Sequence, residues 1–588
     1  MHFGLYAFDL FTVIYEEAWQ IAQPDHPFHA LAKASPAFAP FIDWVGSVRS
    51  HQEFAQQIPR LIIERNLHGI DIDPRAAQIA GLSLWLRAQR AWHQAGVKSA
   101  DRPRITRSNL VCAEPMPGEK ELLREFVEQQ FPAGERPAFA FLLEKIFDRM
   151  TLAGEAGSLL RIEEEIRAAI VEARALAQNQ SAPRPAELWA SDERPEQAEF
   201  DLRGLNDEQF WQRAEQRIYD ALEAYAEQAE NRGGFQRRPF ADDAAQGFAF
   251  IDVCRKRYDV AVMNPPFGLM PTEVYRYLVT NYPTSYSDLA LAFMARGSEW
   301  CSPNGLVGAI TSRAFLNVSD AEKFRRMVAL HHLRLLADLG VGVMDDAFVD
   351  ASAQILSTSR EAHLWIKDAR KAKDKSQPLL NFIESVSDSP AFVFLHSHFE
   401  TIPQCRIVYD SGEGLGSLLS SLNSVEPIYG IARTGASTFE DDRFLRLIWE
   451  IGAANLGSDK MWCWIARTIP DFCQFYYPYE IASKWNRDGA ELCERNRQVN
   501  GQIAQARQGS SHYFKPGIVF SRRSRPSIAF RVQPGGNVFS STCGVVFPSR
   551  METSLFLMGV LNSRFVRAAI HTLTTYSYTV GHIRAILA

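Results

Sequence analysis

The chain has 588 residues, of which 46% are hydrophobic and 11% aromatic, so it is long enough for several domains and has the composition of a folded protein. The 8 cysteines are scattered without a Cys-x-x-Cys pair and the 14 histidines show no metal spacing, which argues against a zinc site or a disulfide framework. We find no signal peptide and no long uncharged apolar run, and therefore expect a cytoplasmic protein without a membrane segment. The net charge of −6 argues mildly against nucleic-acid binding, although a basic cleft can lie on an acidic body.

The first informative stretch is Leu67–Pro74, which predicts a short apolar strand ending in two carboxylates and a proline. A helix is predicted to follow from Arg75 to about Arg90. An acid at the end of the second strand of a nucleotide-type fold typically binds ribose hydroxyls. Alternation places Asp71 and Asp73 on one face, and Asp73 is also in position to cap the helix. We expect both roles, with Asp73 starting the helix and Asp71 binding.

A weaker signal follows at Ile105–Leu110, which predicts another strand ending in a polar residue, Asn109. An asparagine in a simple turn explains the same pattern nearly as well.

From about Pro115 to Gly247 the sequence becomes rich in Ala, Glu, Arg and Gln. Leu160–Ile170 and Phe210–Ala229 have helical periodicity with acid–base pairs at helix spacing, and a Pro- and Ser-containing stretch separates them. We interpret residues 115–247 as a helical insertion. Its charges favour a solvated face over a binding surface.

The most informative stretch is Tyr258–Gly268, where an apolar strand over Val260–Met263 delivers Asn264, Pro265, Pro266 and Phe267 at its carboxyl end. Ligands of open α/β sheets bind at such ends. The Asn264 side-chain carbonyl and the Pro265 carbonyl can accept the two N–H groups of an amino-bearing base, and Phe267 offers a face for stacking. The prolines stiffen the loop. A Pro-Pro turn with Asn264 as a turn residue is the structural alternative.

Asn-Pro-Pro-Phe after a strand resembles the catalytic motif of amino-group methyltransferases that use S-adenosylmethionine, chiefly the adenine-N6 DNA enzymes. The next segments follow the same order. Ser287–Phe293 predicts a helix with Asp288 near its start, and Ser302–Gly305 leads into a strand over Leu306–Thr311. Ser312–Leu316 resembles the short segment after the fifth strand, and Arg334–Gly340 and Ala353–Leu356 suit the last strands.

The resemblance implies S-adenosylmethionine as the cofactor. It implies that Asp71 binds the ribose and that Asn109 lies near the adenine amino group. The family's glycine-rich first motif is absent, and the start of the chain, with Phe3 and Gly4, resembles the tail of that motif and its helix. We therefore expect a fragment of a larger enzyme, without the first strand of the sheet, that binds the cofactor poorly by itself.

From about Thr401 onward, strand-like pieces alternate with turns, and aromatic residues are dense from Trp462 to Trp485. Interleaved basic and aromatic side chains can track a phosphate backbone and stack on bases. Ordinary solvated arginines on a surface strand explain the pattern almost equally well. The basic residues of this region that we assign to nucleic acid are Lys515, Arg522, Arg523 and Arg525, and Arg531 lies close to them in sequence.

Segments spread along nearly the whole chain resemble the large methyltransferases of the phage-exclusion (BREX, PglX-type) systems. They include Leu5–Phe11, Asp441–Arg446, Tyr513–Gly517 and Thr575–Gly581. The resemblance implies an α/β class I S-adenosylmethionine-dependent methyltransferase fold with a Rossmann-like sheet. We divide the chain into the front of the methyltransferase domain (1–114), the helical insertion (115–247), the rest of that domain with the catalytic motif (248–400), and an α+β target-recognition portion (401–588).

The implied reaction is methyl transfer to adenine N6 of double-stranded DNA, with the adenine flipped out of the duplex and no metal involved. Other phage-defence subunits are expected partners. Two alternatives remain open. Asn-Pro-Pro motifs also methylate glutamine amides and RNA amino groups, although the aromatic and basic C-terminal region favours DNA. The second alternative is a catalytically silent DNA-binding or assembly subunit of a defence complex, which the absent glycine motif supports.

Overall fold

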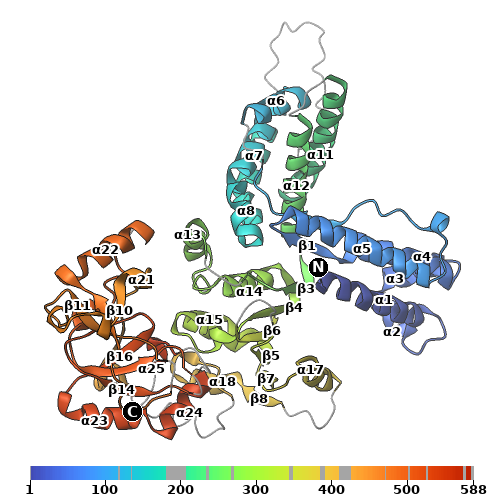
Figure 1. Cartoon of the computed structure of the whole chain (residues 1–588). Coiled ribbons are helices and arrows are strands. Elements are labelled where there is room, and N and C mark those ends of the chain that lie inside the picture. Colours follow the sequence, from blue (N-terminus) through green and yellow to red (C-terminus); the bar gives the residue numbers. More distant parts are fainter. Residues whose placement is uncertain are drawn as a thin grey trace. The chain divides into compact units, whose positions relative to one another are not determined.

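The computed structural model describes residues 2–116, 120–133, 135–180, 207–232, 237–266, 270–343, 349–384, 391–409, 425–469, 472–500, 503–524, 527–573 and 578–584. The chain has a mixed α/β fold, as predicted, and divides into two compact units (Figure 1). The first comprises Met1–Val262, Gly268–Asn281 and Ala292–Ser302, and the second comprises Met263–Phe267, Tyr282–Leu291 and Pro303–Ala588. None of the described helices is long and apolar enough to cross a membrane.

The first unit opens with helices that share one apolar core. Phe8 of the first helix, Phe54 of the fourth and Trp92 of the fifth are buried together in it. Ser50 starts the fourth helix, because its side chain accepts a hydrogen bond from the Glu53 amide. The helices are α1 (His2–Ala22), α2 (His29–Ala34), α3 (Ala39–Ser47), α4 (His51–Leu61) and α5 (Pro74–Gln94).

Two short parallel strands, β1 (His68–Asp71) and β2 (Asn109–Cys112), form a sheet beside these helices. A Cβ on Gly69 would lie 2.7 Å from the Leu110 side chain, so glycine permits the close approach of the two strands here. The strand predicted before Asp71 and the helix predicted from Arg75 are confirmed, and the helix continues to Gln94.

The described residues between β2 and the next strand are mostly helical. Trp211, Ile218 and Tyr225 are buried along one face of its longest helix, at spacings of seven residues. The helix predicted over Phe210–Ala229 is confirmed within it, whereas Ile166 interrupts the predicted one near Leu160. The helices are α6 (Lys120–Gln130), α7 (Arg136–Arg149), α8 (Ala153–Ala156), α9 (Ile162–Glu165), α10 (Arg167–Gln180), α11 (Asp207–Arg232) and α12 (Arg237–Arg255). The four-part domain division stays a prediction.

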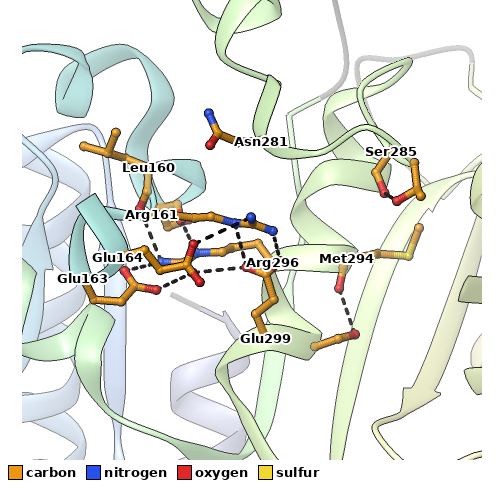
Figure 2. Close-up of polar contacts among 12 residues, drawn as sticks. Leu160, Arg161, Glu163, Glu164, Asn281, Ser285, Met294, Arg296 and Glu299 are labelled. Carbon is orange, nitrogen blue, oxygen red and sulfur yellow. Dashed lines mark hydrogen bonds and ion pairs between the residues drawn. The ribbon is translucent and has the colours of Figure 1, made fainter. Parts of the chain in front are cut away.

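A buried guanidinium joins this helical segment to α14 (Leu289–Trp300), which belongs to the first unit from Ala292 onward. Arg296 is 1% exposed, and its Nη1 and Nη2 atoms donate to the two carboxylate oxygens of Glu163 at 2.6 and 2.8 Å. It also donates to the Ser158 and Leu160 carbonyls, and it stacks 4.5 Å from the centre of the Trp300 ring. Figure 2 shows Arg296 with Glu163 and Leu160. The Arg296 guanidinium is thus surrounded by a carboxylate, carbonyl oxygens and an aromatic ring, all of which stabilise a positive charge.

Neighbouring polar contacts extend this attachment. Arg161 pairs with Glu299, one turn after Arg296 in the same helix (Figure 2). The Tyr277 hydroxyl of α13 (Thr272–Asn281) accepts from the Arg161 amide and donates to Glu165, at 2.9 Å each. Both helices that follow the Asn264 segment are therefore tied to the same short stretch, residues 158–165.

Strand β3 (Tyr258–Met263) confirms the strand predicted before Asn264. It forms the edge of a sheet with strand order β3-β4-β6-β5-β7-β8. Val260 and Val262 point to the same side of this strand and are 57% and 52% exposed. Among the described residues β3 has one strand neighbour, and so has β1.

Apart from Cys301 and Ser302 at the start of β4, the remaining strands of that sheet belong to the second unit. Strand β6 is antiparallel to both of its neighbours, β4 and β5, and β5 runs parallel to β7. The strands predicted near Leu306, Arg334 and Ala353 are confirmed, although the first begins earlier, at Cys301. The strands are β4 (Cys301–Ser312), β5 (Leu333–Gly340), β6 (Ala351–Ser357), β7 (His363–Asp368) and β8 (Phe392–Leu395), with α17 (Ser376–Ile383) and α18 (His396–Glu400) beside them.

The C-terminal portion contains two four-stranded sheets and two apolar cores, one of which is built from residues of both sheets. Along β13, Phe520 belongs to one core and Val519 to the other, because alternate residues point to opposite faces. One sheet has the order β14-β13-β16-β9 and the other β10-β12-β11-β15. The strands are β9 (Gly430–Thr434), β10 (Leu445–Leu447), β11 (Trp462–Ala466), β12 (Ile481–Lys484), β13 (Gly517–Ser521), β14 (Phe530–Gln533), β15 (Val538–Phe539) and β16 (Cys543–Pro548). The helices of this portion are α20 (Val425–Ile428), α21 (Asp441–Phe444), α22 (Asn486–Asn500), α23 (Ser554–Leu561), α24 (Arg564–Leu573) and α25 (Val580–Arg584).

The Arg296 contacts predict a large effect for a substitution that is nearly isosteric. Glu163→Gln should lower the free energy of unfolding by about 3 kcal/mol, because the buried guanidinium loses the carboxylate that neutralises it. Glu164→Gln is the matched control: its side chain is 55% exposed and pairs with Arg161 at 3.8 Å, so a loss of at most about 1 kcal/mol is expected. Urea denaturation of both variants measures the difference, and equal losses would contradict the assignment.

His582 predicts a pH dependence of stability in the second unit. Burial, followed by the charges of Arg406 and Arg522, lowers its pKa to about 4. The unfolded chain therefore binds a proton at higher pH than the folded chain does, and stability should fall as the pH falls from about 6.5 to about 4. The loss attributable to this group should be on the order of 3 kcal/mol at its acid limit. Denaturation of His582→Gln across this range should show a correspondingly smaller decline, and parallel profiles would refute the role.

Candidate functional site

Two acidic side chains lie at the carboxyl end of β1 in the first unit. Asp71 is exposed, and its Oδ1 atom accepts a hydrogen bond of 3.0 Å from the Asp73 amide. Asp73 is the N-cap of α5 and accepts from the Arg75 amide at 2.9 Å. Contacts with Arg75 hold the pKa of Asp73 below its usual range. The predicted helix-starting role of Asp73 is confirmed, and the cofactor roles of both aspartates stay predictions.

The end of β2 adds a third carboxylate to this edge. Strand pairing places Cys112 beside Asp71, and the Ala113 amide donates to the Asp71 carbonyl at 2.7 Å. Burial and, to a smaller extent, the carboxylates of Glu114, Asp71 and Asp73 together raise the pKa of the Cys112 thiol to about 12. An edge with this electrostatic character suits hydroxyl or cationic groups better than a phosphate.

The position predicted for Asn109 at the end of its strand is wrong, and its cofactor role stays an untested prediction. Asn109 is the first residue of β2, paired with His68 at the start of β1, so it lies at the opposite end of the strands from Asp71. Its side chain is buried, and its amide nitrogen is within 3.0 Å of the Glu64 carbonyl and 3.4 Å of the Ile63 carbonyl. The apolar run continues from Leu110 through Ala113, and Leu110–Cys112 of this run form the rest of the strand. The Asn109 side chain thus holds the backbone of residues 63 and 64, which precede β1, through hydrogen bonds.

Phe3 and Gly4, assigned to the cofactor by resemblance, lie in the first turn of α1. Phe3 is 38% exposed. A Cβ on Gly4 would lie 3.8 Å from the Leu84 side chain, an ordinary contact distance, so packing against α5 does not by itself require glycine. The cofactor role of these residues stays a prediction.

The Asn264 segment lies in the second unit, directly after β3. Asn264 and Pro266 are exposed, and Pro265 between them is buried. Phe267 lies outside the described residues. Asp288 precedes α14 and accepts from the Ala290 amide at 2.8 Å, which confirms its predicted place near the start of that helix. The segment thus exposes the amide side chain of Asn264 next to the buried Pro265.

A buried ionic cluster around strand β5 of the second unit was missed by the sequence reasoning. Asp338 of β5 is fully buried and accepts from Arg313, just after β4, at 2.9 Å and from the Tyr409 hydroxyl at 2.5 Å. Arg370 approaches it to 3.7 Å. Burial raises the pKa of Asp338, and the guanidinium of Arg313 opposes that shift. The only sequence signal is a carboxylate inside an apolar strand, Leu333–Gly340.

The basic residues assigned to nucleic acid do not form one uniform surface. Lys515 and Arg523 are exposed. Arg522 is half-buried and donates to the Ser541 carbonyl at 2.9 Å, which gives it a structural partner. Arg525 lies outside the described residues. Arg531, close to them in sequence, is buried on β14. The role of the four assigned residues in binding nucleic acid stays a prediction.

Comparison with known proteins gives matches over most of the chain. Residues 65–343 match the family model of the Eco57I restriction-modification methylases. The chain is 24% identical over 350 residues to the adenine-specific methyltransferase PglX of Lacticaseibacillus casei (strain Zhang), covering 56% of this chain and 29% of that protein. It is 22% identical over 566 residues to the adenine-specific methyltransferase BrxX of Escherichia coli O9:H4 (strain HS), covering 90% of this chain and 41% of that protein.

Among solved structures, the chain is similar to the type IIL restriction-modification enzyme MmeI in complex with DNA, at 10% identity and a TM-score of 0.37, covering 94% of this chain and 66% of that one. The chain spans less than half the length of the two methyltransferases it matches. The matched family region contains Asp71, Asp73 and the Asn264 segment. Over residues 65–343 the chain is therefore similar to the Eco57I restriction-modification methylases, and it is a distant relative of adenine-specific methyltransferases.

Proposed function

We propose that this chain carries the catalytic part of a site-specific DNA methyltransferase that transfers a methyl group from S-adenosylmethionine to adenine N6, in a phage-defence system of the BREX or restriction-modification type. The observation that carries the proposal is the exposed Asn264 between a six-residue strand and the buried Pro265, inside the region that matches the Eco57I methylases. The adenine-specific activity of the relatives PglX and BrxX, as their names state it, supports the substrate.

The residues after β3 would act on the amino group of the target base. The Asn264 side-chain carbonyl and the Pro265 backbone carbonyl each accept one N–H, which raises electron density on the nitrogen and orients its lone pair. Phe267 would stack on the ring. An adenine in a duplex must leave the base stack to reach such a segment, so a flipped base in double-stranded DNA is the proposed substrate.

The edge formed by Asp71, Asp73 and Glu114 fits part of the cofactor. The exposed Asp71 carboxylate can accept hydrogen bonds from ribose hydroxyls, and three carboxylates suit a ligand that carries positive charge. When bound, S-adenosylmethionine supplies an electrophilic methyl group on a sulfonium centre. Asp73, already engaged at the start of α5, would position the backbone next to Asp71. The solved DNA complex of MmeI supports DNA as the partner only by analogy.

Asn264→Ala should abolish methylation while leaving DNA binding nearly unchanged, because the side chain is proposed to touch the reacting amino group and not the duplex. We expect adenine methylation to fall by at least roughly 100-fold. The measurement is N6-methyladenine in genomic DNA with the gene at its native locus, together with duplex binding by the purified variant. Asn381→Ala is the control, since Asn381 bonds Gln377 in an exposed helix turn. Undiminished methylation by the Asn264 variant would rule out the catalytic assignment.

Substitutions of Asp71 and Asp73 should have different effects, the first on cofactor affinity and the second on stability. Asp71→Ala is expected to weaken S-adenosylmethionine binding by about tenfold or more through the loss of a charged acceptor. Asp73→Ala should instead lower stability by about 1 kcal/mol through the lost N-cap, with little change in affinity. Calorimetric titration and denaturation of both variants distinguish the two roles, and a larger loss of affinity for Asp73→Ala would reverse them.

A further inference from the structure

The second unit contains a cavity of about 100 Å³ that no part of the methyl-transfer proposal uses. It lies between strands of the two C-terminal sheets. Two segments, residues 465–469 and 477–481, form most of its wall, and Val519, Arg531 and Val532 complete it. The cavity is smaller than the engineered apolar cavity of about 150 Å³ that accommodates benzene, so its occupant is a small group or a protruding part of a larger molecule.

Arg531 is the unusual member of this wall. It is 3% exposed, and its Nη1 atom lies 3.5 Å from the Ser521 hydroxyl. No carboxylate among the described residues forms an ion pair with it. The other arginine of the cavity, Arg467, pairs with Asp441 at 2.8 Å. Burial lowers the pKa of Arg531, as expected for a charge removed from water without a counter-charge. A buried cation in this state destabilises the fold unless an anion reaches it.

Hydrogen-bond donors of the cavity wall point to the kind of anion. Tyr477 and Tyr479 line the cavity with Arg531, and a phenol hydroxyl can donate to an oxyanion. A guanidinium offers a planar fork of donors that matches two oxygens of a phosphate. Most of the remaining wall is apolar, with Ile465, Ala466, Val519 and Val532 among its residues; Thr468, Arg467 and the exposed Glu480 also line it, and Glu480 is the one carboxylate that an anion would have to avoid. The apolar side chains exclude water from their side of the cavity, and this strengthens a contact between Arg531 and an anion.

We propose that this cavity is a binding site for a phosphate group, held by Arg531. The assignment does not rest on the methyltransferase proposal, because it follows from a buried cation, its cavity and the donors around it. The phosphate can be a free one, as inorganic phosphate or the terminal group of a nucleotide, or a phosphodiester of DNA. These sources share the chemistry and differ in the size of the molecule that must reach the cavity.

The test compares thermal denaturation of the 588-residue chain in sodium phosphate and in sodium chloride of equal ionic strength. Wild type should show a midpoint that rises by a few degrees with phosphate and then saturates. Arg531→Met should lose the saturable rise, and its midpoint without phosphate should equal or exceed that of wild type, because an uncompensated buried charge has been removed. Arg550→Met, which removes an exposed arginine, should behave as wild type does.

Equal rises for wild type and Arg531→Met would overturn the proposal, since general salting effects of phosphate would then explain them. If Arg531→Met does not fold, calorimetric titration of wild type with inorganic phosphate decides: saturable binding supports the site, and its absence refutes it. Duplex DNA then separates the sources. A loss of duplex affinity in Arg531→Met identifies a phosphodiester, whereas unchanged duplex affinity together with a lost phosphate effect identifies free phosphate or a nucleotide.

Discussion

The desolvated charge of Arg296 constrains how the first unit is built. A guanidinium that is 1% exposed must find acceptors in every direction, and it finds them in Glu163 and in the carbonyls of Ser158 and Leu160. These acceptors come from a short stretch between α8 and α10, so one side chain determines where that stretch packs. Because Arg161 and Tyr277 reinforce the same contact, α13 and α14 share one anchor. A charge change at position 163 or 296 alone leaves a buried ion unpaired, so these positions can change without loss only together.

Parallel strand ends supply a second constraint, this time on chemistry. The register of β1 and β2 places the residues after Asp71 beside those after Cys112, and the side chains found there are acidic. The end of β3 in the second unit carries an amide and two prolines instead. One edge is therefore rich in carboxylates, whereas the other offers amide and carbonyl acceptors. The proposed function assigns these two chemistries to a cofactor and a base.

Local signals in the sequence predicted what local interactions determine. Asp73 before Pro74 predicted a helix start, and the structure has that cap with a 2.9 Å hydrogen bond. The apolar run before Asn264 predicted β3 within two residues. Asn109 was placed at the wrong end of its strand because two overlapping runs, Ile105–Leu110 and Leu110–Ala113, both look strand-like, and only burial against neighbouring helices selects the second. Arg296 and Arg531 could not be recognised, since an arginine in a helix or strand is ordinarily exposed and only tertiary packing buries it.

Strand β3 also has a consequence for handling the chain in solution. Its outer edge has no strand neighbour among the described residues, and the exposed Val260 and Val262 make its surface apolar. Free backbone donors and acceptors next to such side chains form a template onto which an extended segment of another molecule can pair. With a net charge of −6 spread over 588 residues, electrostatic repulsion opposes such pairing only weakly. The colloidal stability of concentrated samples therefore depends on what covers this edge.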